Sequence, residues 1–173
     1  MVIDAIKNRR SIRQFKQPFF IPKKQMFALL EAAMLAPSAC NTRPWRFIVV
    51  EHRDGLEKLS ELHDYGKMIK TASSCIVVVG LPALQEGHEK DLPKGFLPQD
   101  CAAATQNILI QAEAMGLGTC WCGVYPKEPV MKRVSEFLKL LPGEIPFCLI
   151  AVGEKDQDPE QRGKYDELKV AWV

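Results

Sequence analysis

The chain has 173 residues, of which 47% are hydrophobic, and its formal net charge at pH 7 is +2. This length and composition predict one domain with a sizeable core. The near-neutral charge gives no indication of a nucleic-acid partner, and the lack of an 18-residue apolar run excludes a predicted membrane span. The first ten residues, MVIDAIKNRR, lack the apolar segment of a secretory signal, so we expect a cytoplasmic protein.

The first half of the chain alternates helical and strand-like patterns. A short helix is expected at residues 2–9, followed by a loop that contains Pro18 and Pro22. Apolar residues at helical spacing predict an amphipathic helix at 23–35, which Pro37 ends. The remaining elements predicted here are a strand at 46–51, a short helix at 55–62 and a continuous apolar strand at 74–80.

A long polar loop is expected at residues 81–98, and loops of this length often act as lids. The helix predicted at 99–115 has Asp100 near its positive end and Gly116 at its C-terminal cap. This helix is apolar nearly all the way round, so it should be buried on several sides. Because a chain this short rarely buries one helix fully, the pattern indicates a partner subunit. Also predicted are a strand at 119–124, a helix that begins at Pro129 and a strand at 147–152.

These elements predict an α/β or α+β fold, with about four core strands and helices on the faces of the sheet. A charged tail begins at Gly153 and contains Tyr165, Leu168, Val170 and Trp172. It is too apolar for a free arm, so we expect it to add a strand or to wrap a partner.

The six cysteines do not indicate a disulfide framework, because the chain is neither short nor secreted in character. Cys120 and Cys122 flank Trp121 in a predicted strand, so both should point to one face. We interpret them as small buried residues rather than as a metal site or a redox pair. The three histidines lack ligand spacing, and no metal site is predicted.

Two polar segments are candidates for binding. Residues 9–13, RRSIR, place three guanidinium groups and a hydroxyl within five positions, which suits a phosphate but also describes a solvated basic turn. Residues 37–45, PSACNTRPW, form a loop stiffened by two prolines between a helix and a strand. The loop is either a binding element or an ordinary connection.

Motifs for other chemistries are missing from the sequence. The glycines of GLG at 116–118 follow a helix and precede a strand, which is the reverse of the dinucleotide-binding order. There is no Walker A lysine motif and no G-x-S-x-G elbow. No nucleophile has a convincing base partner in the sequence, so a side-chain catalytic residue is not predicted.

Taken together and in this order, RRSIRQF, PSACNTRPW, GLGTCWCG and a terminal R-x-K resemble the nitroreductase family of flavoproteins. The resemblance covers nearly the whole chain, and GLGTCWCG and PSACNTRPW are its most specific parts. It implies one nitroreductase-like α+β domain over residues 1–173. The implied architecture is a central mixed sheet of about four core strands flanked by helices, with a C-terminal tail that wraps the partner subunit. Members of the family bind FMN at the interface of a homodimer and use NADH or NADPH.

The resemblance also implies which residues bind FMN. Arg9 and Ser11 would meet the phosphate, and Arg13 would reach toward the pyrimidine edge of the ring. The other implied phosphate ligands are Arg10, Arg162 and Lys164. Several cations close together are what a phosphate dianion requires.

A loop from the other subunit would touch the flavin ring. The implied contacts are Pro37, Ser38, Ala39 and Asn41. Family members often have Ser at the position of Ala39 and Gln at that of Arg43, so Ala39 would act through its backbone, and Arg43 would add charge on the substrate side.

The remaining implied contacts surround the ring itself. Asp64 would accept a hydrogen bond from the ring, where the family often has Asn, and Lys67 would stabilise negative charge on the reduced ring. Trp121, Cys122 and Gly123 would run along the face of the flavin, where a backbone N–H bonds N5. Such a contact leaves the Cys122 thiol without a catalytic role.

The implied activity is an oxidoreductase that takes a hydride from NAD(P)H and reduces nitro compounds, quinones or related acceptors by a ping-pong mechanism. Lys67 and Arg13 would give electrostatic support, and residues 81–98 would line the substrate side. Three alternatives stay open. They are a reductive dehalogenase or flavin-destroying enzyme of related fold, a non-enzymatic flavin-binding protein, and a plain structural α/β domain.

Overall fold

The structure is a computed structural model in which residues 1–87, 95–160, 163 and 165–173 are described. Its α-helices are α1 (Asp4–Asn8), α2 (Lys23–Met34), α3 (Arg53–Leu62), α4 (Leu97–Ala114) and α5 (Glu128–Leu138). Its strands are β1 (Trp45–Val50), β2 (Ser74–Gly80), β3 (Leu117–Gly123) and β4 (Ile145–Glu154). Short 3₁₀ helices lie at η1 (Ala39–Asn41), η2 (Lys67–Thr71), η3 (Pro82–Gln85) and η4 (Glu167–Lys169).

Each helix and strand predicted from the sequence is present, with ends that differ from the prediction by at most a few residues. The strand predicted at 74–80 coincides with β2, whose seven residues are all buried. Within the loop expected at 81–98, η3 and the first turn of α4 are helical, and residues 88–94 lie outside the described part of the chain. Pro98 occupies the first turn of α4, where its missing N–H leaves no intrahelical bond unmade.

The sheet has the strand order β1-β2-β4-β3, and every neighbouring pair runs antiparallel. The prediction of a mixed sheet is therefore wrong for these four strands. Among the residues that the structure describes, parallel pairing is confined to an isolated bridge between Ser11 and Thr119. Alternation of strands with helices does not determine strand direction, because a helical connection can also return a strand antiparallel.

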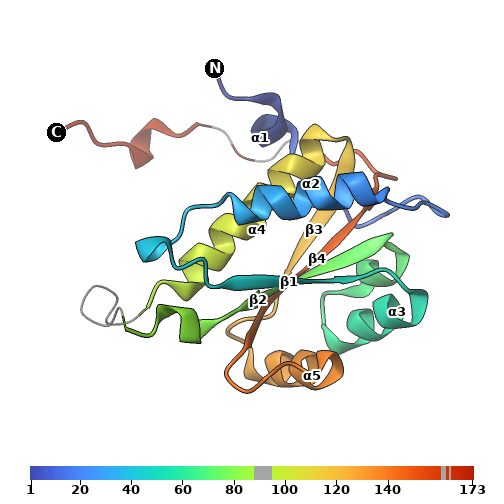
Figure 1. The fold of residues 1–173 in the computed structure, drawn as a ribbon. Helices are drawn as coiled ribbons and strands as arrows, with labels where there is room; N and C mark the ends of the chain where they lie inside the picture. The colour runs from blue at the N-terminus through green and yellow to red at the C-terminus, as the bar shows by residue number, and fades with distance from the viewer. Residues whose placement is uncertain (88–94, 161–162, 164) are drawn as a thin grey trace.

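Helices lie on both sides of the sheet (Figure 1), and a hydrophobic core is buried on each side. On one side α4 lies against the sheet and α2 packs against α4, with Leu29 and Ile108 fully buried between them. On the other side α3 and α5 cover the sheet, with Leu56 and Val134 fully buried. The fold is therefore α+β, as predicted.

Helix α4 is covered within its own chain by the sheet and by α2, and its buried apolar residues face these two neighbours. Cys101, Ala104 and Ala112 are fully buried within the core that α4 shares with the sheet and α2. Ala102, Ala103 and Ile110 on the same helix are only partly buried within the chain, so a partner subunit that covers the rest of α4 stays a prediction. Among the described residues, no helix is long and apolar enough to cross a membrane.

Candidate active site

Two cavities lie beside the N-terminal turn and β3, and Arg13 lines both. The first, of about 1020 Å³, is formed by α1, the turn at 9–13 and the segment that includes Gln157 and Tyr165. We call it the α1 cavity. The second, of about 810 Å³, is formed by β3, residues 63–68 and Lys127. We call it the β3 cavity. Because Arg13 lines both, the two cavities are neighbours, and we consider them together as one candidate site.

The turn at 9–13 is fixed to the sheet through Ile12. The Ile12 N–H donates to the Thr119 carbonyl at 2.8 Å, and the Ile12 side chain is 1% exposed. Gly118 makes this contact possible, because a Cβ at Gly118 would lie 2.9 Å from Ile12 side-chain carbons. The buried Ile12 leaves Ser11 and Arg13 on either side of it to line the cavities.

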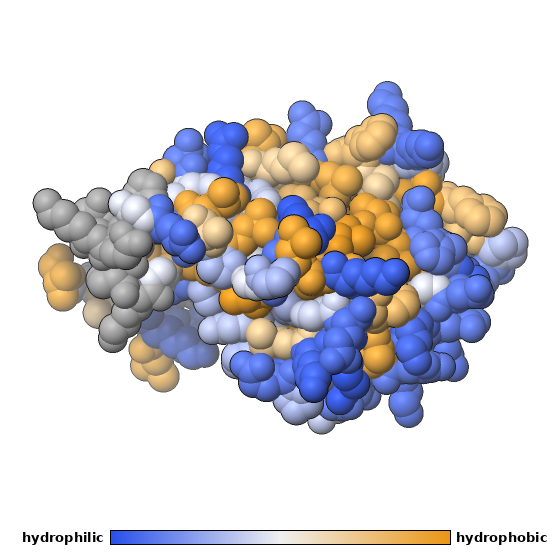
Figure 2. Space-filling model, turned by 60° about the horizontal axis from the view of Figure 1, so that its bottom comes forward, coloured by the Kyte–Doolittle hydropathy of each residue, from blue (hydrophilic) through white to orange (hydrophobic). Residues whose placement is uncertain are grey.

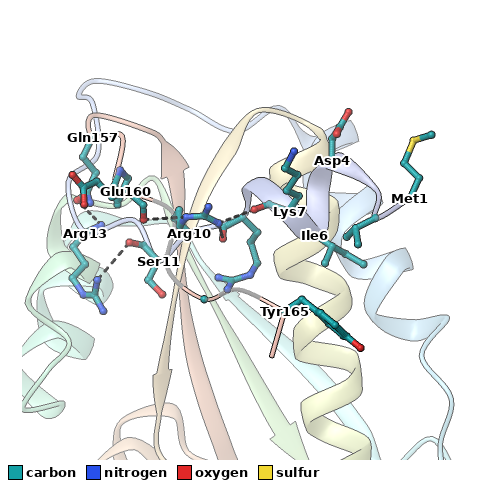
Figure 3. Close-up of a pocket in the computed structure, with 14 residues that line it drawn as sticks. Met1, Asp4, Ile6, Lys7, Arg10, Ser11, Arg13, Gln157, Glu160 and Tyr165 are labelled. Atoms are coloured by element: carbon teal, nitrogen blue, oxygen red, sulfur yellow. Dashed lines mark hydrogen bonds between the residues drawn. The ribbon is translucent and has the colours of Figure 1, made fainter. Parts of the chain in front are cut away.

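Arg10 ties α1 to the C-terminal segment. Its guanidinium donates to the carbonyls of Lys7 at 2.9 Å, Arg9 at 2.7 Å and Glu160 at 3.3 Å (Figure 3). The Arg13 backbone N–H donates to Gln157 Oε1 at 2.9 Å. Of the predicted phosphate ligands, Arg9, Arg10 and Ser11 therefore line one cavity. Arg162 and Lys164 lie outside the described residues.

Strand β3 is at the edge of the sheet, and its free edge faces the β3 cavity. The carbonyl of Thr119 accepts from Ile12 on this side, and the carbonyl of Gly123 bonds His63 Nε2 at 2.9 Å. Because alternate residues of a strand direct their N–H and C=O groups to the same side, the N–H and C=O of Trp121 point to that side too. The cavity thus has a backbone donor at its wall.

His63 was not singled out from the sequence, although it closes one end of the β3 cavity. It is 4% exposed, and its Nδ1 accepts the Tyr65 N–H at 3.1 Å. Nδ1 is therefore the unprotonated nitrogen, and Nε2–H donates to Gly123. Also missed were Tyr65, Met68, Tyr125 and Lys127. No local pattern marks these residues, because they meet only through the fold.

Asp64 and Lys67 both line the β3 cavity. Asp64 Oδ1 lies 3.7 Å from Arg133 Nη2, and both side chains are largely exposed, so this ion pair is a weak restraint. Lys67 begins η2, a turn that the sequence prediction did not contain. The structure thus brings Arg13, Asp64 and Lys67 to the same cavity as Trp121–Gly123.

Cys120 and Cys122 point to the same face of β3, as predicted, and join the core beneath α3 and α5. All six cysteines are free thiols. Cys122, hydrogen-bonded to Cys120, lowers the pKa of the Cys120 thiol, and the charge of Arg13 adds to this effect. The same hydrogen bond, together with burial, raises the pKa of Cys122. Cys120 is thus the more acidic thiol of the two.

The loop at 37–43 belongs to a different part of the molecule. It carries η1, which is hydrogen-bonded to Asp100 in the first turn of α4, whereas α1 lies beside the other end of that helix (Figure 1). With 18 residues, α4 is about 27 Å long. Within one chain, the predicted contacts Pro37, Ser38, Ala39 and Asn41 are therefore remote from the turn at 9–13.

Comparison with known proteins gives a consistent result. The model of the nitroreductase family matches residues 6–64 and 63–154. A protein of Methanothermobacter thermautotrophicus, named for NADH dehydrogenase and NAD(P)H nitroreductase activity, is 41% identical over 169 residues, covering 98% of this chain and 85% of the relative.

Two solved structures show the same similarity. The FMN-dependent nitroreductase of Clostridium difficile R20291 is 29% identical with a TM-score of 0.85, over 99% of this chain and 98% of that one. A structure from Desulfovibrio desulfuricans, described as a complex with FMN, is 28% identical with a TM-score of 0.78, over 98% and 95% of the two chains. The family model and the archaeal relative together cover nearly the whole sequence. The chain therefore belongs to the nitroreductase family.

Proposed function

We propose that this protein is an FMN-dependent oxidoreductase that takes a hydride from NAD(P)H and reduces nitro compounds, quinones or related acceptors. The observation that carries the proposal is the meeting of the α1 and β3 cavities at Arg13. One cavity is rich in guanidinium groups and the other is walled by an edge strand and apolar side chains. A ligand with a phosphate at one end and a flat ring at the other fits this pairing. The FMN-bound and NAD(P)H-named relatives support the choice of cofactor and donor.

The α1 cavity fits the phosphate through its donor set. Arg9 and Ser11 supply a charged fork and a hydroxyl, and charge-assisted hydrogen bonds to phosphate are among the stronger ones in proteins. Arg10 contributes by holding α1 against the C-terminal segment, and its charge adds to the field. Arg162 and Lys164 complete the cationic set in this proposal.

The β3 cavity fits the ring through one backbone donor and two side-chain cations. The Trp121 N–H points to the free edge of β3, and Gly123 leaves space there because an added Cβ would meet nothing within 4 Å. Trp121, Gly123 and Lys67 all line the cavity. When bound, FMN supplies the hydride relay between donor and acceptor. Lys67 and Arg13 favour negative charge at the ring, and Asp64 accepts a hydrogen bond.

The site is completed by a second subunit. The loop carrying Ser38, Ala39 and Asn41 is too far along α4 from its own turn at 9–13, so in this proposal it serves the flavin of the partner. Exposed apolar side chains are plentiful enough for a homodimer interface, including Phe27, Leu35 and Trp172. On the face shown in Figure 2, hydrophobic side chains gather in a band across the middle. The C-terminal tail wraps the partner, and the dimer is cytoplasmic.

Donor and acceptor use the same place in turn, which gives the ping-pong mechanism. The α1 cavity is assigned to the phosphate, so the open part of the β3 cavity serves both substrates. The acceptor side extends toward a third cavity of about 510 Å³, which Tyr125 also lines. Residues of the 81–98 segment, including Pro82 and Leu97, line that cavity.

The experiment that tests the function is a visible absorption spectrum followed by steady-state kinetics. The purified protein should be yellow and should release FMN when denatured. Rates with varied NAD(P)H and a quinone or nitroarene should give parallel double-reciprocal lines. A colourless protein that fails to bind added FMN would refute the proposal. FMN binding without NAD(P)H oxidation would instead favour a non-enzymatic flavin-binding protein, and intersecting lines would exclude the ping-pong mechanism.

A further inference from the structure

The loop at 37–43 has an unusual backbone. Cys40, Asn41 and Arg43 have φ values of 51°, 53° and 48°, which lie in the left-handed region. This region is unfavourable for residues with a Cβ, so such a conformation persists only where surrounding contacts hold it. Ser38 Oγ accepts the Arg43 N–H at 2.9 Å, and Thr42 Oγ1 donates to the Ala39 carbonyl at 2.9 Å. These bonds close the loop on itself but do not fix it to the body of the protein.

Asp100 supplies a connection to the core. Its Oδ1 accepts the Ala39 N–H at 3.0 Å, and its Oδ2 accepts Gln85 Nε2 at 3.0 Å. The side chain is 5% exposed and lies in the first turn of α4, where the helix dipole favours a carboxylate. A buried carboxylate with both oxygens hydrogen-bonded has one well-defined position, so it can hold the Ala39 backbone in place.

Gln85 brings a third segment into this network. It belongs to η3, is 9% exposed and lines the cavity of about 510 Å³ on the proposed acceptor side. Asp100 therefore joins η1, η3 and α4 at one point. The contact lies at the end of α4 remote from α1, where the loop would project toward a partner.

We propose that Asp100 is a positioning residue that holds the loop at 38–43 in the conformation that reaches the flavin of the partner subunit. The inference rests on the proposed function, because the loop that Asp100 holds is the one proposed to contact the flavin, while Asp100 itself lies outside the flavin site. Asp100 does not touch the ring; it acts through the Ala39 backbone. Without the Asp100 carboxylate, the loop can leave its left-handed conformation. The fraction of molecules whose loop is placed to contact the flavin ring then falls.

The anchor is tested first without flavin, by amide hydrogen exchange at Ala39. Asp100→Ala should increase the exchange rate of the Ala39 amide by about tenfold or more, as expected for losing a hydrogen bond to a charged group. Asp100→Asn keeps an acceptor oxygen and should restore most of the protection. Thr105→Val is the matched control, since it removes a buried hydrogen bond from the same helix, to the Cys101 carbonyl, without touching the loop. Unchanged Ala39 protection in Asp100→Ala would overturn the inference.

The second arm asks which subunit the anchor serves. Asp100→Ala and Arg9→Ala homodimers should each bind FMN weakly, whereas Thr105→Val should bind it normally. Mixed dimers of the Asp100→Ala and Arg9→Ala chains should regain one good site, which combines an intact Arg9 from one chain with an intact Asp100 from the other. Gln85→Leu gives a second route if Asp100→Ala does not fold, and should show the same complementation more weakly.

The outcomes separate the two proposals. Mixed dimers that regain no FMN binding would mean that Asp100 acts within its own subunit, which would overturn the inference. Wild-type protein that binds no FMN would refute the proposed function, while Ala39 exchange would still decide whether Asp100 anchors the loop.

Discussion

The two cavities of the candidate site are built from different kinds of structure. The wall of the β3 cavity is the sheet itself. Cys120 and Cys122 are buried there, and His63 is hydrogen-bonded to the Gly123 carbonyl. The α1 cavity is formed by the two ends of the chain, a helix of five residues with no buried side chain and the segment beyond Glu154. Under the proposed function, the flavin ring would therefore meet a preorganised wall, whereas the phosphate would meet chain ends that can adjust. The contrast predicts that substitutions at the two cavities have different consequences.

The largest expected effect comes from disrupting the contact between Ile12 and Gly118, which fixes the turn at 9–13 to β3 beside both cavities. Gly118→Val places a side chain against Ile12, whose carbons lie 2.9 Å from the added Cβ. Overpacking of this kind typically costs about 1–3 kcal/mol, and displacement of Ile12 would also move the turn at 9–13. We expect a lower free energy of unfolding in urea and a loss of FMN binding.

Gly123→Ala is the control for that change, because its added Cβ meets nothing within 4 Å. It should leave the unfolding midpoint unchanged. Equal stability of the two variants would mean that Ile12 does not fix the turn to β3.

The next effect is confined to the α1 cavity. Arg9→Ala should weaken FMN binding by about 1.5–3 kcal/mol, the range for a hydrogen bond to a charged group. The free energy of unfolding should not change, since α1 contributes no buried side chain. Fluorescence titration of FMN measures the affinity. Lys23→Ala, which removes an exposed charge at the start of α2, should bind FMN like the wild type.

A smaller effect on affinity, but a clear one on turnover, is expected in the β3 cavity. Lys67→Ala should lower the rate of flavin reduction by NAD(P)H more than it weakens FMN binding, because its charge matters most when the ring becomes negative. Rapid-mixing kinetics on the FMN-loaded variant separates the two. An affinity loss larger than the rate loss would place Lys67 at the phosphate instead.

The smallest effect concerns the thiols. Without FMN, alkylation of Cys120 in a Cys40→Ser background should be half-maximal below the ordinary thiol value of about 8.5. The contribution of this lowered pKa to stability is present above the unfolded pKa and is lost as the pH falls through the folded one. Arg13→Gln should shift the alkylation profile to higher pH.

Turnover should survive Cys122→Ala, because in the proposed site the strand would contact the flavin through the backbone of Trp121. A variant that binds FMN but is not reduced by NAD(P)H would contradict this assignment.

The sequence predicted what local patterns encode. The apolar run of β2 and the helical period of α2 gave the correct elements, and the basic turn, Lys67 and Trp121–Gly123 indeed share one region. Strand direction was not predictable, because it depends on how connections cross the sheet.

Long-range contacts were equally out of reach. The His63 ring meets Gly123 from 60 residues away, and Asp100 meets the Ala39 N–H from 61 residues away. The sequence identifies Asp100 as a negative charge near the start of a helix, and this local pattern does not indicate its partners Ala39 and Gln85. The packing of α2 against α4 could not be predicted either, because it too depends on contacts between segments that are distant in the sequence.

The blocked ends of β3 have a consequence for how the protein behaves at high concentration. An edge strand with free N–H and C=O groups is a template on which another chain can add, which is the first step of strand-mediated aggregation. Here Ile12 occupies the edge at Thr119 and His63 occupies it at Gly123, so the free part between them is about one residue wide. A foreign strand cannot pair across so short a gap, but a flat small molecule can. The edge of β3 thus leaves room for a small molecule while it is protected against the addition of a strand from another chain.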